Sequence, residues 1–245
     1  MSNILKVTGI VLSGYPLGEN DKSLTVLTKE RGKIQLISRG CRKTNSPLFA
    51  ASNEYVFGEF VIAEGRTFKY LNSAEIQMSF SNLRDSLESI CYSSYFCELA
   101  SYFTMEGQDE RNILNLLYLT FLTMGKMILP YRLIRRIYEY KILQFQGMGL
   151  QPSACVRCGR TSDLGFLSFQ EGGVMCGDCS RTVDCRPIEP GILQVFRYLT
   201  DCRLNEIYSF NLREDMLVEF EWLVDRFFKT RTDHRFRSEQ MLEMM

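Results

Sequence analysis

The 245-residue sequence lacks several features on which common enzyme classes depend. It has one histidine, His234, in a polar C-terminal segment, so Ser-His-Asp and Cys-His chemistry have no base. No Gly-x-x-x-x-Gly-Lys-Ser/Thr motif is present, and nucleotide hydrolysis is therefore unsupported. We expect a protein that binds its partners and does not catalyse a reaction.

Long apolar runs are also missing. The most apolar stretch, residues 113–129, is interrupted by Asn115, Gly125 and Lys126 and is shorter than the roughly 20 residues of a membrane span. The first residues show no apolar run with a cleavage site, so we expect no secretory signal. Nine cysteines, an odd number, then indicate a reducing compartment with thiols available for metal. We expect a cytoplasmic protein that does not contact a membrane.

The chain has no net charge, since 29 basic residues balance 29 acidic ones. Positive charge is nevertheless concentrated between residues 22 and 43, where Glu30 is the one acid among seven basic residues. A local basic stripe on a neutral protein is typical of a confined polyanion-binding surface. The alternative is a solvated face that binds nothing. The basic residues of the stripe are Lys22, Lys29, Arg31, Lys33, Arg39, Arg42 and Lys43.

The first 78 residues have the pattern of five short strands. Apolar residues alternate or run briefly between turn signals, at 4–12, 24–28, 33–38, 55–63 and 68–76. Gly32 and Gly65 are expected to supply the positive-φ position of two turns. Five strands in so short a segment favour a closed barrel over an open sheet with exposed edges. With the basic stripe, this pattern predicts an OB-fold, and an SH3-like barrel is the close competitor.

From residue 79 onward the apolar period becomes that of helices. Stripes at three- and four-residue steps occupy 80–91, 114–128, 133–143, 190–199 and 211–227. Asn211 and Glu214 have the spacing of a capping box before the last stripe. Residues 229–245 are polar and expected to fray. We therefore predict an α+β protein, with an OB-fold domain at 1–78 and an all-α domain at 79–245 that carries an inserted four-cysteine zinc-binding motif.

Four cysteines form the most specific motif in the chain. Two Cys-x-x-Cys turns separated by 17 residues have the spacing at which four thiolates surround a tetrahedral Zn²⁺. All ligand positions would be filled by protein, so the single zinc ion would be structural. Buried apolar cysteines or a redox pair are the alternatives, but neither requires two matched pairs. The predicted ligands, within 155–179, are Cys155, Cys158, Cys176 and Cys179.

Acidic pairs allow one enzymatic alternative. Glu19 and Asp21 stand in a predicted loop, where a metal-dependent nuclease can place carboxylates. Solvated loop acids are much commoner, so this reading ranks third. The second alternative is a zinc-containing OB-fold module that binds RNA.

The order of several short motifs resembles the bacterial recombination mediator RecO family. The N-terminal motifs are Val11-Leu12, residues 16–21, residues 27–32 and Ser38-Arg39-Gly40-Cys41-Arg42-Lys43, with Ser46 following. The resemblance continues through residues 74–75 and 80–83, then at residues 149–152 and 172–176, which flank the first and second cysteine pairs. It covers most of the chain and weakens after about residue 200.

The resemblance implies an N-terminal OB-fold, a helical C-terminal domain and no turnover. It further implies a protein of DNA repair and homologous recombination that binds single- and double-stranded DNA and anneals complementary strands. The implied partners are RecR, the acidic C-terminal tail of single-strand-binding protein and, indirectly, RecA, which is loaded onto coated DNA. A cytoplasmic, nucleoid-associated location would suit these partners.

Single strands bind to basic grooves that also carry aromatic platforms. The seven residues of the basic stripe are the predicted phosphate contacts, and Tyr15, Phe49 and Tyr70 are the predicted platforms. For the acidic tail we predict Arg132, Arg135 and Arg136, on adjacent turns of one helix, as a cationic rim. Three solvated arginines are the alternative for this second site.

Overall fold

The computed structural model describes residues 3–244. The chain divides into two compact units: Met1–Lys126 with Phe236–Met245 form the first, and Met127–Arg235 form the second. The chain thus leaves the first unit after Lys126 and returns to it at Phe236. Among the described residues, no helix combines the length and the apolar character needed to cross a bilayer.

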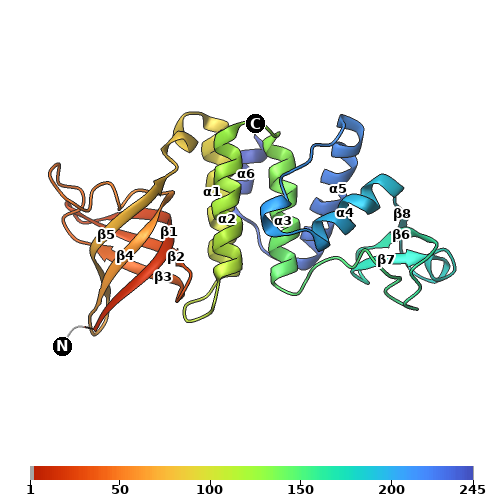
Figure 1. The fold of residues 1–245 in the computed structure, drawn as a ribbon, viewed down its shortest axis with the longest axis horizontal. Coiled ribbons are helices and arrows are strands. Elements are labelled where there is room, and N and C mark those ends of the chain that lie inside the picture. Colours follow the sequence, from red (N-terminus) through yellow and green to blue (C-terminus); the bar gives the residue numbers. More distant parts are fainter. Residues whose placement is uncertain (1–2, 245) are drawn as a thin grey trace. The chain divides into compact units, whose positions relative to one another are not determined.

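Five strands of the first unit close into a barrel in the order β1-β2-β3-β5-β4 (Figure 1). Neighbours are antiparallel except β3 and β5, which meet at a single parallel pair, Ile37 and Tyr70. A bulge between Val11 and Ser13 lets β1 pair with β4 along its first part and with β2 along its second. The strands are β1 (Asn3–Leu17), β2 (Asp21–Thr28), β3 (Gly32–Ser38), β4 (Val56–Glu64) and β5 (Lys69–Ser79). The predicted α+β class with a five-stranded, OB-like barrel is confirmed.

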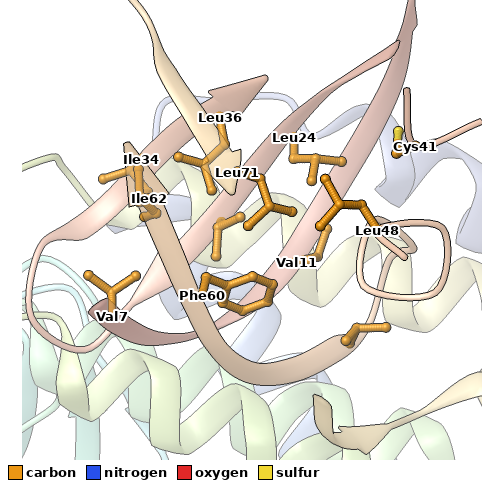
Figure 2. Packing of buried hydrophobic residues seen from close by; sticks show 12 residues of the cluster. Val7, Val11, Leu24, Ile34, Leu36, Cys41, Leu48, Phe60, Ile62 and Leu71 are labelled. Atoms are coloured by element: carbon orange, nitrogen blue, oxygen red, sulfur yellow. The ribbon is translucent and has the colours of Figure 1, made fainter. Parts of the chain in front are cut away.

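Alternating side chains of these strands fill the barrel. In β3, every second residue from Gly32 to Ser38 is buried, which is the period of a strand with one face on the core. Figure 2 shows Phe60 and Leu71 among the aliphatic side chains that converge there. The cluster consists of Val7, Val11, Leu24, Val26, Ile34, Leu36, Cys41, Leu48, Val56, Phe60, Ile62 and Leu71.

Helices complete the first unit, and they begin later than predicted. The apolar stripe at 80–91 is not one helix: a short 3₁₀ turn, η1 (Ser81–Arg84), ends before α1 (Leu87–Phe103) begins. Ser86 starts the new helix by accepting a hydrogen bond from the backbone N–H of Ser89 at 3.1 Å. Leu87, which belongs to the apolar stripe at 80–91, is exposed as a result. The unit also contains α2 (Arg111–Lys126) and α6 (Arg237–Glu243).

The prediction of a frayed C-terminus was wrong. Phe236 is buried and packs edge-to-face against Tyr95 and Tyr102, with ring centroids 6.0 and 5.3 Å away. The Glu98 carboxylate of α1 accepts hydrogen bonds from the backbone N–H groups of Arg237 and Ser238, at 3.0 and 2.9 Å. A single aromatic anchor and one carboxylate therefore order α6, and neither produces a periodic signal in the sequence.

The second unit surrounds α3 (Tyr131–Phe145), which packs against α4 (Pro190–Asp201) and α5 (Glu214–Arg231). A small sheet of order β7-β6-β8 accompanies the cysteines; its strands are β6 (Leu164–Ser168), β7 (Gly173–Cys176) and β8 (Arg186–Pro187). Two 3₁₀ turns, η2 (Cys179–Thr182) and η3 (Leu204–Glu206), complete the unit.

The predicted capping box of α5 is absent. Arg213 is the N-cap residue and makes no side-chain capping bond. The Asn211 side-chain oxygen accepts instead from the backbone N–H of Leu212, at 2.9 Å. The helix thus begins too far along the chain for Asn211 to reach its first turn.

Candidate nucleic-acid interface and metal centre

The basic stripe is divided by the β2–β3 hairpin. Lys22 pairs with Ser38 at one end of the ladder, whereas Thr28 pairs with Gly32 at the turn. These ends are about 20 Å apart at about 3.3 Å per residue. We call Lys22, Arg39, Arg42 and Lys43 the loop-end cluster, and Lys29, Arg31 and Lys33 the turn-end cluster. The stripe read along the sequence is therefore two separate groups in space.

Hydrogen bonds between two turns shape the loop-end cluster. The Asp21 carboxylate accepts from the backbone N–H of Gly40 at 2.7 Å, and Gly40 has a φ of 63° that favours glycine. The Arg42 guanidinium donates to the carbonyl oxygens of Gly18 and Glu19 at 3.1 and 3.0 Å. The chain therefore holds Arg42 and its neighbours in place before any ligand binds.

Members of the loop-end cluster differ in how available their charge is. The Lys22 ammonium donates to the Ser52 carbonyl and the Asn53 side chain, at 3.1 and 3.3 Å, and is half-buried. Arg39 is exposed and lies over the Tyr70 ring, 4.1 Å from its centroid. Arg42 and Lys43 are exposed as well. Three of the four charges can therefore reach a phosphate without giving up a buried contact.

The predicted aromatic platforms are on the surface of the barrel and not in its core. Tyr15 and Phe49 are 66% and 51% exposed. Tyr70 is half-buried beneath Arg39. Exposed rings are what base stacking requires, although the role of these three residues as platforms stays a prediction.

The turn-end cluster is docked on the loop between α1 and α2. The carbonyl of Arg31 accepts from the backbone N–H of Gly107 at 2.9 Å, and the backbone N–H of Lys33 donates to the Met105 carbonyl at 3.3 Å. The Lys33 ammonium donates to the carbonyl of Ser101. Lys29 and the Arg31 side chain are exposed. Lys33 is therefore partly committed to holding the hairpin against the helices.

The four predicted metal ligands converge in the second unit. The sulfurs of Cys155, Cys158, Cys176 and Cys179 all lie within 4.8 Å of one another. They are the one group of three or more Cys, His, Asp or Glu side chains with metal-ligand spacing among residues 3–244. Glu19 and Asp21 belong to no such group among these residues.

The backbone of the first knuckle explains why the sulfurs converge. The Cys155 carbonyl accepts from the backbone N–H of Gly159, and the Cys155 N–H donates to the Arg160 carbonyl, both at 2.8 Å. Gly159 has a φ of 73°, which reverses the chain there. The second knuckle joins the end of β7 to η2, so Cys176 and Cys179 face the first pair.

Four cysteine sulfurs this close to one another favour the binding of a cation between them. Burial opposes ionisation of Cys155, but the backbone N–H groups of Cys158, Cys176 and Arg157 together lower its pKa to about 6. Hydrogen bonds to Cys176, and to a smaller extent to Cys158, raise the pKa of the Cys179 thiol to about 12. Four sulfurs cannot all ionise without a positive charge between them, and the donor set fits Zn²⁺.

The three arginines predicted for the acidic tail lie on α3 with partners of their own. Arg135 and Arg136 bind the fully buried Glu139 carboxylate at 2.8 and 2.7 Å, and Arg136 also binds Asp225 at 3.0 Å. Arg132 is more exposed and contacts Glu214, and Glu221 at 3.4 Å. The apolar neighbours Leu133 and Tyr138 are buried and do not reach the surface. The peptide-binding role of these arginines stays a prediction.

Comparison with known protein families shows to which class of proteins this chain belongs. Models described as "Recombination protein O N terminal" and "Recombination protein O C terminal" match residues 1–80 and 84–240. These matches, which cover the OB-like barrel and the helical part with its four-cysteine cluster, place the chain in the class of recombination proteins. The chain belongs to the RecO family, whose members are non-enzymatic mediators.

Three curated relatives carry the same description, "DNA repair protein RecO". The protein of Alkaliphilus metalliredigens is 34% identical over 193 residues, which are 78% of each chain. The protein of Caldicellulosiruptor saccharolyticus is 37% identical over 182 residues, or 74% of each chain. The protein of Acetivibrio thermocellus is 27% identical over 236 residues, covering 96% of this chain and 94% of its own. The resemblance drawn from the sequence motifs is confirmed.

Proposed function

We propose that this chain binds single- and double-stranded DNA, anneals complementary strands and, with RecR, helps load RecA onto DNA coated by single-strand-binding protein. The observation that carries the proposal is the exposed loop-end cluster of an OB-like barrel, in a chain of the RecO family. Arg39, Arg42 and Lys43 supply exposed cations, and Tyr15 and Phe49 supply exposed rings on the barrel.

Annealing requires strands held by their backbones with base edges free to pair. Phosphate contacts fix the position of a strand and carry no sequence information. The loop-end cluster is made of such contacts, and Gly40 allows the backbone to approach a phosphate closely. The same cations serve both single- and double-stranded DNA, because both expose phosphates.

The four cysteines would hold one structural zinc ion. Cys155, Cys158, Cys176 and Cys179 present the four sulfurs of a closed tetrahedral site, which leaves no position for a reactive water. The ion would fix β7, η2 and the loop before β6 to one another. We assign it a structural role.

Annealing by the purified protein tests the main proposal. Two complementary DNA oligonucleotides should anneal faster with the protein than without it, and ATP should have no effect, because no step hydrolyses a nucleotide. The measurement is fluorescence transfer between labelled strands. The competing RNA-binding proposal is tested in parallel by comparing affinity for oligo(dT) and oligo(U). Preference for oligo(U) without DNA annealing would contradict the mediator function.

The acidic tail of single-strand-binding protein is proposed to bind at α3, with Arg132 as the accessible contact and Arg135 and Arg136 as charges behind it. A peptide carboxylate would compete with Glu214 and Glu221 for the Arg132 guanidinium. Hydrogen bonds to charged groups contribute about 1.5–3 kcal/mol, so Arg132→Ala should weaken the binding of an acidic, apolar-tipped peptide roughly 10- to 150-fold.

Fluorescence anisotropy of the labelled peptide gives the affinity, and DNA binding should not change. Arg213→Ala is the matched control, because Arg213 is exposed in the same unit and its contact is with Asp215. Arg136→Glu is avoided, since a third carboxylate beside Glu139 and Asp225 would disrupt the fold. Equal peptide affinity for Arg132→Ala and the unaltered protein would place the tail elsewhere.

A further inference from the structure

A groove in the second unit has no role in the function proposed so far. It lies where α5 meets the segment around β8, and its volume is about 460 Å³. We call it the Trp222 groove. Its lining residues are Phe169, Asp184, Cys185, Arg186, Trp222, Asp225, Arg226 and Lys229.

Trp222 is the only tryptophan of the chain, and it faces away from the core. It is 48% exposed, whereas Leu217, Phe220 and Leu223 of the same helix are buried. The Arg186 guanidinium lies 4.3 Å from the centre of the indole ring. Phe169 meets the ring edge-on, with centroids 5.8 Å apart. An exposed indole is thus fixed in one orientation by an aromatic edge and a stacked cation.

The groove has positive charge in excess. Asp225 contacts both Arg136 and Lys229 at 3.0 Å, so its charge is already neutralised. Arg186 and Arg226 form no ion pair with any carboxylate of the described residues 3–244. Asp184 is the remaining acid of the lining. An anionic ligand would therefore meet two unpaired guanidinium groups beside an indole.

We propose that the Trp222 groove binds single-stranded DNA, with a base stacked on the Trp222–Arg186 platform and the adjoining phosphate held by Arg226 and Lys229. Aromatic rings and arginine planes stack on bases of any sequence. The inference rests on the proposed function and gives annealing a second strand contact, made by the helical unit and not by the barrel.

The lining of the groove favours nucleic acid over an acidic peptide with an apolar tip. Such a peptide needs an aliphatic pocket for its tip. The groove has two aromatic rings and three cations but no leucine, isoleucine, valine or methionine in its lining. An indole ring with a stacked guanidinium and cations beside it matches a base and its phosphate.

Because Trp222 is the only tryptophan, its fluorescence reports on the groove alone. The full-length protein is titrated with oligo(dT), and stacking should quench the emission to saturation. Quenching should persist in a variant with Arg39, Arg42 and Lys43 replaced by alanine in the barrel. In that variant, adding Trp222→Ala should weaken the remaining binding of labelled oligo(dT) roughly 5- to 150-fold, the range for one stacked base. Arg226→Ala with Lys229→Ala should weaken it as well.

Val218→Ala is the matched control, because Val218 is an exposed residue of α5 outside the groove. Circular dichroism checks that each variant is folded. No quenching by oligo(dT), with DNA binding still dependent on the barrel arginines, would overturn the inference and leave the proposed function standing. Failure of the unaltered protein to bind DNA would overturn both. Quenching by an acidic peptide and not by oligo(dT) would make the groove a peptide site and likewise overturn the inference.

Discussion

Replacing Arg39, Arg42 and Lys43 by alanine should weaken DNA binding for every sequence alike and reduce its dependence on salt. If the barrel neutralises about four to six phosphates of a single strand, log K should fall with log salt at a slope of roughly −3 to −4. Removing three contacts should flatten that slope by about 2, since each accounts for about 0.7. Annealing should slow in parallel. Filter binding at several salt concentrations measures the slope directly.

The structure sharpens the choice of variants for this experiment. Lys22 is left in place because its ammonium holds Ser52 and Asn53, so its loss would disturb the fold. Arg42 also binds the carbonyl groups of Gly18 and Glu19, and Arg42→Lys tests charge apart from that geometry.

Lys29→Ala with Arg31→Ala, at the other end of the hairpin, shows whether the turn-end cluster contacts the same strand. We expect the slope of log K against log salt to flatten less in this variant than in the loop-end variant. A loop-end triple variant with unchanged affinity and slope would show that the cluster is a solvated face, and the DNA site would have to be sought elsewhere.

Serine in place of Cys155 or Cys176 should abolish zinc binding and unfold the region around the cysteines. The protein as purified should contain about one zinc per chain. Zinc-finger peptides gain about 10–16 kcal/mol from the metal at neutral pH, so losing one ligand should cost a large part of the stability of this region. The barrel should stay folded, because its core lies in the first unit and the cysteines in the second.

Elemental analysis gives the zinc content, and hydrogen exchange separates the two regions. Faster exchange is expected in β6 and β7, with protection retained in β1 to β5. Cys185→Ser is the matched control, because Cys185 packs against the cluster and donates to the Ser180 carbonyl at 3.2 Å without belonging to the four. A protein purified under reducing conditions without chelator that holds no zinc would refute the assignment.

The sequence predicts best where a feature depends on neighbouring residues. The barrel was predictable because buried and exposed residues alternate between glycine turns, as in β3. The four cysteines were predictable because two short knuckles need only fixed spacing to present their sulfurs. The confirmed fold class and family follow from such local regularities.

The remaining features depend on contacts between distant residues. Glu98 and Phe236 are 138 positions apart in the sequence. No local sequence pattern predicts that Glu98 orders α6, the helix that follows Phe236. The seven basic residues formed one stripe in the sequence, but the hairpin register separated them. The exposure of Trp222, in contrast, has a local signal in the sequence. Trp222 lies off the apolar stripe of α5, and this position indicates an exposed side chain.

Because the chain returns to the first unit at Phe236, one part of this unit is synthesised much later than the rest. The barrel, α1 and α2 are complete once Lys126 has been synthesised, but Phe236 and α6 belong to the same unit. Synthesis from Lys126 to Phe236 adds 110 residues, which takes roughly 5 to 20 seconds at about 5–20 residues per second. During that interval the rings of Tyr95 and Tyr102 lack their Phe236 contact. Residues that are synthesised long after the barrel therefore complete the first unit, and until they are in place its aromatic surface is accessible to chaperones and proteases.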